Sequence, residues 1–336
     1  MTDSSISSAS SATLSPIHAS GRPVTPSLEL QCPVCRQRLR RSFSLPQPGC
    51  VACGFTIYEV NGIWHALPPF RESSFRRFVQ EYETVRAQEG RGSSSADYYL
   101  ALPFDDLTGR NVWQWQIRAR TFRFLEKNLL RKIELSCPMG CDVLDVGAGN
   151  GWLSYRLAMR GHRPVAVDLL DNDTDGLAAA RHYFPRLAHS FPRFKAEMDS
   201  LPFSGAQFDI VIFNASFHYS VNYQRTLKEA RRCLRPGGHL IIADSPFYRR
   251  EESGQEMLQE KRATFERRFG FRSDSTPSCE YLTPAILSDL ATKLALEWNT
   301  YRPWYGINWA LRPVKARLMR RREPSKFYLL HARMES

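Results

Sequence analysis

The stretch Val143-Leu144-Asp145-Val146-Gly147-Ala148-Gly149-Asn150-Gly151-Trp152-Leu153 decides the fold. Its first four residues are mostly apolar and branched, a composition typical of a buried parallel strand. Three glycines follow at every second position, and from Trp152 to Arg160 the apolar residues recur with helical spacing. Glycine permits a tight turn, and the free N–H groups at a helix start are hydrogen-bond donors. The stretch therefore predicts a strand, a turn and a helix that together cradle a nucleotide-like ligand.

The spacing of the glycines discriminates between nucleotide ligands. A dinucleotide-binding turn has the pattern Gly-x-Gly-x-x-Gly, but the sixth position here is the bulky Trp152. The observed Gly-x-Gly-x-Gly, preceded by Val-Leu-Asp, resembles motif I of the class I S-adenosylmethionine (SAM)-dependent methyltransferases. This resemblance implies an α/β fold with a Rossmann-like, seven-stranded methyltransferase sheet, helices on both faces, and SAM as the cofactor. The cofactor contacts that it implies in this stretch are Asp145, Gly147, Ala148, Gly149, Asn150 and Gly151.

Two further acids stand where such a domain holds a nucleoside. The expected strand 164–168 ends in Asp168, which lies 21 residues after Gly147 and is followed by Leu169. At about this distance a βαβ unit presents a carboxylate to the ribose hydroxyls, and a carboxylate accepts hydrogen bonds from both of them. The segment Asp199-Ser200-Leu201-Pro202-Phe203 resembles the methyltransferase segment in which an acid and the adjacent backbone contact adenine. We therefore expect cofactor contacts from Asp168, Leu169, Asp199, Ser200 and Leu201.

The next expected strand, 208–214, ends in Asn214, another expected cofactor contact, and the turn Leu-Arg-Pro-Gly-Gly at 234–238 is a further motif of the same family. Methyl transfer from a sulfonium depends mainly on alignment, and a base is needed only for a protonated acceptor. His218 is the candidate base because imidazole titrates near neutrality, although a histidine here equally suits packing over the donor. The Asn/Asp-Pro-Pro-Tyr/Phe signature of amino-group methyltransferases is absent after Asn214, which disfavours exocyclic nitrogen acceptors.

The N-terminal part carries a second site. Two Cys-x-x-Cys pairs, Cys32 with Cys35 and Cys50 with Cys53, have the spacing of a closed tetrahedral Cys₄ site, which predicts a structural zinc ion. The segment 56–64 reads as a β-hairpin that turns at Asn-Gly. This ribbon is similar to those of ribosomal RNA guanine-N1 methyltransferases and of zinc-ribbon subunits that partner other methyltransferases. Arginines at 36, 38, 40 and 41 either contact phosphate or form a solvated face.

The pattern along the chain predicts four parts: a disordered tail (1–27), the zinc ribbon (28–70), a helical linker or cap (71–135) and the methyltransferase domain (136–336). In the cap, Tyr98, Tyr99 and Trp113 either line the SAM pocket or belong to the core. The 336 residues carry a net charge of +12 and a basic segment at 312–322, which suits acidic partners or a membrane surface but also an exposed helix. No apolar run approaches a membrane span and no secretory signal is present, so we expect a cytoplasmic protein.

These patterns favour an enzyme, a SAM-dependent methyltransferase, whose acceptor is a small or lipid-like molecule. The first alternative is a ribosomal or transfer RNA base methyltransferase that grips phosphates with its ribbon and basic segment. The second is a non-catalytic SAM-binding adaptor. The sequence leaves the acceptor atom and the oligomeric state open.

Overall fold

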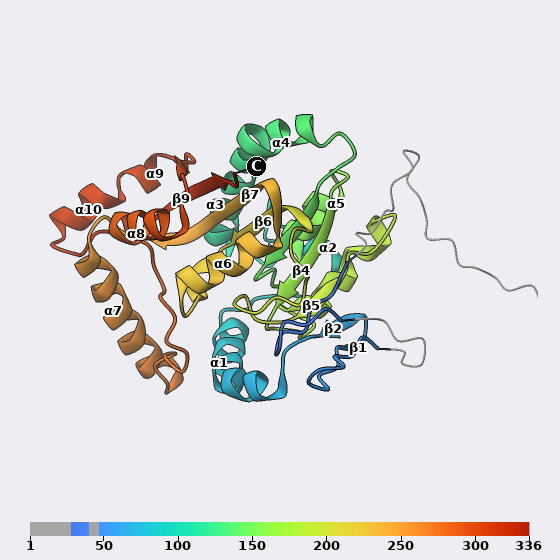
Figure 1. Ribbon diagram of the computed structural model, residues 1–336. Coiled ribbons are helices and arrows are strands. Elements are labelled where there is room, and N and C mark those ends of the chain that lie inside the picture. The colour runs from blue at the N-terminus through green and yellow to red at the C-terminus, as the bar shows by residue number, and fades with distance from the viewer. Residues whose placement is uncertain (1–27, 40–46, 336) are drawn as a thin grey trace, which may run out of the picture.

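The computed structural model describes residues 28–39 and 47–335. The predicted disordered tail, 1–27, lies outside these residues, as do Arg40 and Arg41 of the ribbon. A single sheet with the strand order β1-β2-β5-β4-β3-β6-β7-β9-β8 forms the centre of the molecule (Figure 1). Its strands are β1 (Tyr58–Val60), β2 (Ile63–His65), β3 (Asp142–Val146), β4 (Arg163–Asp168), β5 (Arg193–Lys195), β6 (Phe208–Asn214), β7 (Leu234–Phe247), β8 (Asn299–Tyr301) and β9 (Lys326–Arg333).

Seven of these strands form the predicted Rossmann-like core. Strands β5, β4, β3, β6 and β7 are parallel, and β9 runs antiparallel to both β7 and β8. The antiparallel strands β9 and β8 thus close this end of the sheet. The turn predicted at 234–238 lies inside β7 as a bulge, since the register with β6 shifts between Phe208 and Ile210 and Gly237 has a φ of +73°.

The prediction of a seven-stranded sheet with a separate ribbon is wrong in strand number. The predicted hairpin is present, with Asn61 and Gly62 at positive φ as a two-residue hairpin turn requires. Its second strand, however, pairs in parallel with β5, so β1 and β2 extend the sheet to nine strands. An unpaired β5 would leave a row of backbone groups exposed, and the hairpin covers them. The predicted domain boundary near residue 70 stays a prediction.

The two faces of the sheet carry separate hydrophobic cores because successive side chains of a strand point to opposite faces. Leu144 and Val146 of β3 belong to the core under α6 (Tyr223–Cys233) and α8 (Pro284–Leu294), which the Cys₄ knuckles also join. Val143 points to the other face, under α5 (Trp152–Ala158) and α3 (Val112–Leu125). A π-helical turn (Glu126–Leu130) connects α3 to α4 (Arg131–Ser136).

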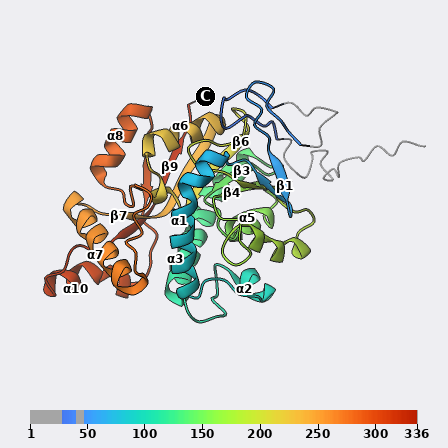
Figure 2. The same ribbon diagram turned by 90° about the horizontal axis from the view of Figure 1, so that it is seen from below.

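Helices before β3 form the predicted cap. The long helix α1 (Pro69–Gln88) runs across the edge of the sheet at which β3 and β4 end, and the short α2 (Ala96–Ala101) precedes α3 (Figure 2). Short 3₁₀ turns at Leu177–His182, Phe184–Arg186 and Phe217–Tyr219 complete the connections between strands.

The C-terminal part contributes α7 (Glu251–Phe269), α9 (Ile307–Ala310) and α10 (Arg312–Leu318), which lie on the side of the molecule away from β1 and β2 (Figure 1). Within the described residues, no helix has the length and the apolar composition that a bilayer crossing requires.

Candidate functional site

A cavity opens at the carboxyl ends of β3, β4 and β6, the edge at which open α/β sheets bind ligands. Most of the predicted cofactor contacts line it, and they come from four separate segments of the chain. These are Asp145, Gly147, Ala148, Gly149, Asn150, Asp168, Leu169, Asp199 and Asn214. Their role in binding stays a prediction, but the fold brings them to one place.

The glycine turn needs glycine for two physical reasons. Gly147 has a φ of +74°, and a Cβ placed on it would lie 2.2 Å from the Cβ of Ser216. Ser216 in turn donates its hydroxyl to the carbonyl of Val146 at 2.5 Å, so it cannot move away freely. The turn is thereby held tightly against the end of β6, with its backbone open to the cavity.

Asp168 fixes the other side of the glycine turn. One carboxylate oxygen accepts the N–H of Gly149 at 2.7 Å, and the other accepts the N–H of Leu170 at 2.8 Å. Burial raises the pKa of Asp168 to about 6, although these backbone donors oppose the shift. Each oxygen retains acceptor capacity, because a carboxylate has about four lone-pair sites. The side chain can therefore position the turn and still accept from a diol.

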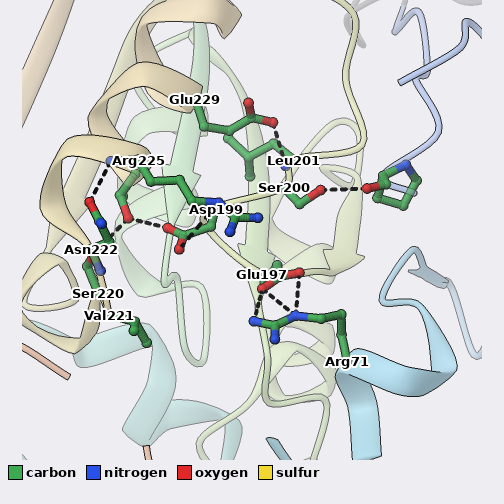
Figure 3. Close-up of polar contacts among 12 residues, drawn as sticks. Arg71, Glu197, Asp199, Ser200, Leu201, Ser220, Val221, Asn222, Arg225 and Glu229 are labelled. Carbon is green, nitrogen blue, oxygen red and sulfur yellow. Dashed lines mark hydrogen bonds and ion pairs between the residues drawn. The ribbon is translucent and has the colours of Figure 1, made fainter. Parts of the chain in front are cut away.

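Asp199 lines the cavity beyond the end of β5 and is held by helix α6. The hydroxyl of Thr226 donates to it, and Arg225 lies 4.0 Å away (Figure 3). Burial raises the pKa of this carboxyl as well.

Three predicted contacts do not line the cavity. Ser200 donates its hydroxyl to the carbonyl of Pro33 in the first cysteine knuckle, at 2.8 Å. The N–H of Leu201 donates to Glu229 at 2.8 Å, and its side chain is fully buried in the core (Figure 3). Gly151, with a φ of +78°, faces Ala180 and Phe191 behind the turn. These residues support the site from outside it.

Helix α1, which belongs to the segment predicted as a helical linker or cap, forms the roof of the cavity. Its lining side chains, spaced three or four residues apart, are Arg71, Phe75, Phe78, Tyr82 and Arg86. Spacings of three and four place side chains on one helical face. Arg71 joins the roof to the rim by pairing with Glu197 at 2.6 Å (Figure 3). Arg86 pairs with Asp175 at 2.5 Å. The recurrence of aromatic residues and arginines at spacings of three and four was the signal in the sequence that could have indicated this lining face.

The aromatic residues predicted for the pocket lie elsewhere. Tyr98 and Tyr99 are buried in the core, where the Tyr99 hydroxyl donates to the carbonyl of Thr174 at 2.7 Å. Trp113 is 47% exposed and packs against Trp309 instead. The face of α3 that lines the cavity carries Trp115 and Arg118. Among the two possibilities stated for the cap tyrosines, the core placement is confirmed.

Arg118 is a buried cation in the cavity wall; the charges of Asp244 and Asp175 favour its protonated form, but neither carboxylate pairs with it directly. Its guanidinium lies over the ring of Trp115 at 4.7 Å and makes no hydrogen bond or ion pair with the residues that the structure describes. Burial, together with nearby Arg91 and Arg86, lowers its pKa to about 10. A buried charge that lacks a partner destabilises a fold. An anionic group of a ligand would supply that partner.

His218 lies behind the cavity wall rather than in it. Its ring packs on Tyr219 at 4.3 Å, and Tyr219 is the side chain that faces the cavity. Burial lowers the pKa of His218 to about 4, and its Nδ1 atom is buried without a hydrogen-bond partner in the described structure. The ring is therefore neutral at pH 7 and a weak base. Its assignment as the catalytic base stays a prediction that this placement does not favour.

The four ribbon cysteines come together as predicted. Their sulfur atoms all lie within 4.8 Å of one another, with Cys32 to Cys53 at 3.5 Å and Cys35 to Cys50 at 3.3 Å. Zinc–sulfur bonds of about 2.3 Å in a tetrahedron would place sulfurs about 3.8 Å apart. The cluster thus has the ligand number and the dimensions that a structural zinc ion requires.

The ribbon arginines are engaged within the protein. Arg36 pairs with Glu229 at 2.6 Å and also donates to the carbonyl of Asp199, and Arg38 pairs with Glu29. Arg40 and Arg41 lie outside the described residues. Arg36 therefore holds the ribbon to the fold, whereas Arg38 is paired within the ribbon itself.

Part of the chain is similar to known methyltransferases. Residues 144–242 match the family model described as a methyltransferase domain. The sterol 4-C-methyltransferase of Caenorhabditis elegans is 25% identical over 193 residues, which cover 53% of this chain and 56% of that protein. The malonyl-[acyl-carrier protein] O-methyltransferase of Hahella chejuensis is 36% identical over 109 residues, which cover 32% of this chain and 37% of that protein.

A solved structure, the 1,6-didemethyltoxoflavin-N1-methyltransferase of Burkholderia thailandensis with bound S-adenosylhomocysteine, aligns with a TM-score of 0.46 and 16% identity over 88% of this chain and 98% of that chain. The chain spans only about a third to a half of the length of the curated relatives it matches. The family match over the glycine turn and the following strands supports a class I SAM-dependent methyltransferase domain.

Replacing Arg118 with methionine should separate ligand binding from stability. Because the buried charge has no partner, we expect Arg118→Met to leave the free energy of unfolding of the ligand-free protein unchanged or raise it by about 1 kcal/mol or more. The affinity for a ligand whose anion pairs with Arg118 should fall about tenfold or more. Urea melts and calorimetry measure the two effects, with Arg123→Met, an exposed position of the same helix, as the control.

Two ligands identify the anion that Arg118 binds. If it is the methionyl carboxylate, Arg118→Met weakens S-adenosylhomocysteine but not 5′-methylthioadenosine, which lacks that carboxylate. If the variant binds each of the two ligands as tightly as the wild type does, Arg118 does not bind the carboxylate, and an anionic acceptor is its remaining partner. Strong destabilisation of the ligand-free variant would contradict the idea of an unpaired charge.

Asp145 provides a test by pH. It is 1% exposed and accepts a hydrogen bond from Ser154, and burial raises its pKa to about 7. A carboxyl with a raised folded pKa binds a proton more readily in the fold, so its contribution to stability is lost as pH rises towards 7. Asp145→Asn should therefore gain stability relative to the wild type between pH 5 and pH 7, on the order of 2 kcal/mol. Urea melts at both pH values measure it, and a pH-independent difference would contradict the shift.

Proposed function

We propose that the protein transfers a methyl group from SAM to a small or lipid-like acceptor. The observation that carries the proposal is the convergence of the glycine turn, Asp168 and Asp199 on one cavity, inside the segment that matches the methyltransferase domain. Gly147 keeps the turn tight against Ser216, with which a Cβ would clash, and Arg118 makes no direct ion pair among the described residues. Both features fit a ligand that has a nucleoside and a carboxylate.

Each lining residue has a defined task in this proposal. Asp168 accepts from the ribose hydroxyls, Asp199 from the adenine amino group, and the N–H groups of the glycine turn face the amino-acid portion. Bound SAM supplies an activated methyl group, so the protein does not have to create a strong electrophile. Helix α1, clamped by Arg71 and Glu197, excludes water from the cavity and holds the reactants in place.

The aromatic part of the cavity lining favours a carbon-rich acceptor. Phe78, Tyr82 and Tyr219 form a cluster with ring centroids 5.7 to 6.2 Å apart, and all three line the cavity. Such a surface suits an apolar or ring-bearing acceptor, as the sterol and acyl substrates in the names of the two relatives also suggest. The RNA alternative receives no support from the ribbon, whose described arginines are paired within the protein.

We further propose that the Cys₄ cluster binds zinc and that the ribbon stabilises the adenine side of the cavity. Pro33 accepts from Ser200, and Arg36 contacts both Glu229 and the carbonyl of Asp199. These contacts join the first knuckle to the segment that contains Asp199, and Figure 3 shows the hydrogen bond made by Ser200. The zinc ion is closed to substrate by its four sulfur ligands, so its role is structural.

Binding and turnover of labelled SAM test the main proposal. Asp168→Asn places an amide NH₂ group beside the donating N–H of Gly149 or Leu170, and we expect the SAM affinity to fall about tenfold or more. Asp173→Asn, at an exposed position close by, should bind as the wild type does. Mass spectrometry of cell extract incubated with the protein and isotope-labelled SAM then identifies the methylated molecule.

The outcomes of this experiment separate the three readings. Label in a lipid or another small molecule supports the proposal, whereas label in RNA would establish the alternative. SAM binding without turnover across extracted metabolites and RNA would indicate an adaptor. A protein that binds no SAM would contradict all three.

Removal of zinc should weaken SAM binding from a distance. A chelator, or Cys50→Ser, should release the knuckle from Ser200 and Asp199 and lower the SAM affinity, by about fivefold if one hydrogen bond of about 1 kcal/mol is lost. Metal analysis and calorimetry measure both effects, with Cys279→Ser, which lies outside the cluster, as the control. Purified protein without zinc, or unchanged SAM affinity after its removal, would be the opposite result.

A further inference from the structure

An outward-facing apolar stripe lies on the helical segment formed by α9 and α10. Ile307, Leu311, Val314 and Leu318 are 69%, 54%, 57% and 80% exposed. Backbone hydrogen bonds from Leu311 to Ile307 and from Lys315 to Leu311 make the segment continuous. At 100° per residue, the four side chains fall within an arc of about 60°. Four large aliphatic residues on one exposed helical face are unusual for a surface that meets only water.

The packing of the fold does not explain this stripe, because the segment is anchored by its other side. Trp309 lies about 200° around the helix from Ile307 and stacks on Phe327 at 5.4 Å. Trp309 also contacts Trp113, and the guanidinium of Arg312 covers its ring at 3.8 Å. The inner side is thus fixed to the protein, and the apolar side is exposed. The segment itself lies at the periphery of the molecule (Figure 1).

Cations surround the stripe. Lys315 and Arg317 stand about 80° to either side of it, and Arg320 and Arg321 follow at its end. All four are exposed and none forms an ion pair among residues 28–39 and 47–335, although Glu256 and Glu260 of α7 border the adjoining groove. Glu260 is already paired with Arg322 at 2.6 Å. Long basic side chains that flank an apolar face can extend to lipid phosphates while the apolar face enters the acyl region.

We propose that this surface (residues 304–321) docks the protein on a bilayer that contains anionic lipids. The exposed Trp304, 67% accessible, stands at the start of the surface, and tryptophan favours the lipid–water interface. Aliphatic side chains do not stack on bases, so the stripe does not suit a nucleic acid. Pairing with a second copy across a two-fold axis would bring the same unpaired cations together. An anionic bilayer neutralises these cations and buries the stripe at once.

The location of the surface gives the docking a use, a step that depends on the function proposed above. Helix α3 begins at Val112 and Trp113, which are exposed beside Trp309, and its next turns carry Trp115 and Arg118 into the cavity wall. Docking would therefore hold the cavity close to the lipid surface. An acceptor that resides in that surface is the substrate class that this arrangement favours.

Sedimentation of the full-length protein with vesicles tests the docking without SAM or an acceptor. We expect binding to vesicles of equal parts phosphatidylcholine and phosphatidylglycerol, little binding to phosphatidylcholine alone, and weaker binding as salt rises. Leu318→Glu should lower the affinity about tenfold or more, because it removes apolar contact and adds a repelled charge. Leu135→Glu is the matched control, since Leu135 is 86% exposed and lies on α4, outside the proposed surface.

The charges are tested in the same way. Arg320→Gln and Arg321→Gln should each lower the affinity about fivefold, whereas Arg131→Gln and Lys132→Gln on α4 should not. Absence of binding to anionic vesicles at low salt, or unchanged binding by Leu318→Glu, would overturn the proposal. A dimer in solution that Leu318→Glu dissociates would also overturn it, since the stripe would then pair two copies. A protein that methylates a soluble acceptor but fails to bind vesicles would refute the docking and retain the function.

Discussion

The site depends on the hydrogen bond from the Gly149 N–H to the Asp168 carboxylate, 2.7 Å long. It joins the turn after β3 to the end of β4, the two neighbouring strands whose ends form the floor of the cavity. The bond requires Gly147 and Gly149 at positive φ on one side and a buried carboxylate on the other. The shape of the cavity floor and its charge therefore depend on the same hydrogen bond, so a change in the glycine turn also changes the surroundings of the carboxylate.

A second layer of contacts extends this constraint to the N-terminal ribbon. The carboxylate of Glu229 on α6 accepts three hydrogen bonds. The donors are Arg36 of the first knuckle, Arg232 of the same helix and the N–H of Leu201. These donors lower the pKa of Glu229 even though burial opposes the shift, so the carboxylate stays ionised and bonded. The ribbon is therefore joined to the Rossmann-like core by charge-assisted hydrogen bonds, and the pairing of β2 with β5 adds backbone bonds.

The sequence predicted the elements whose signals are local. The glycine turn, the acid at the end of β4, the hairpin at Asn61-Gly62 and the cysteine pairs each depend on spacings within about 25 residues, and each is found. Contacts between distant segments were not predictable: nothing near β2 indicates that it pairs with β5, and nothing near Ser200 indicates that its hydroxyl reaches Pro33. A helical cap was predicted, but its lining residues on α1 were not, because an amphipathic pattern shows which face of a helix is buried and not that this face covers a cavity.

The cavity combines charges that the ligand-free fold does not satisfy. Burial raises the pKa of Asp145, Asp168 and Asp199 on the floor, and it lowers the pKa of Arg118 in the wall. Each shift shows a charge that would be more stable in water, so the site reduces the stability of the fold that contains it. The same charges complement a ligand that carries a cationic sulfonium and amine together with a carboxylate. Binding of such a ligand would relieve both kinds of strain, because its hydroxyl and amino groups would donate hydrogen bonds to Asp168 and Asp199 and its carboxylate would lie beside Arg118.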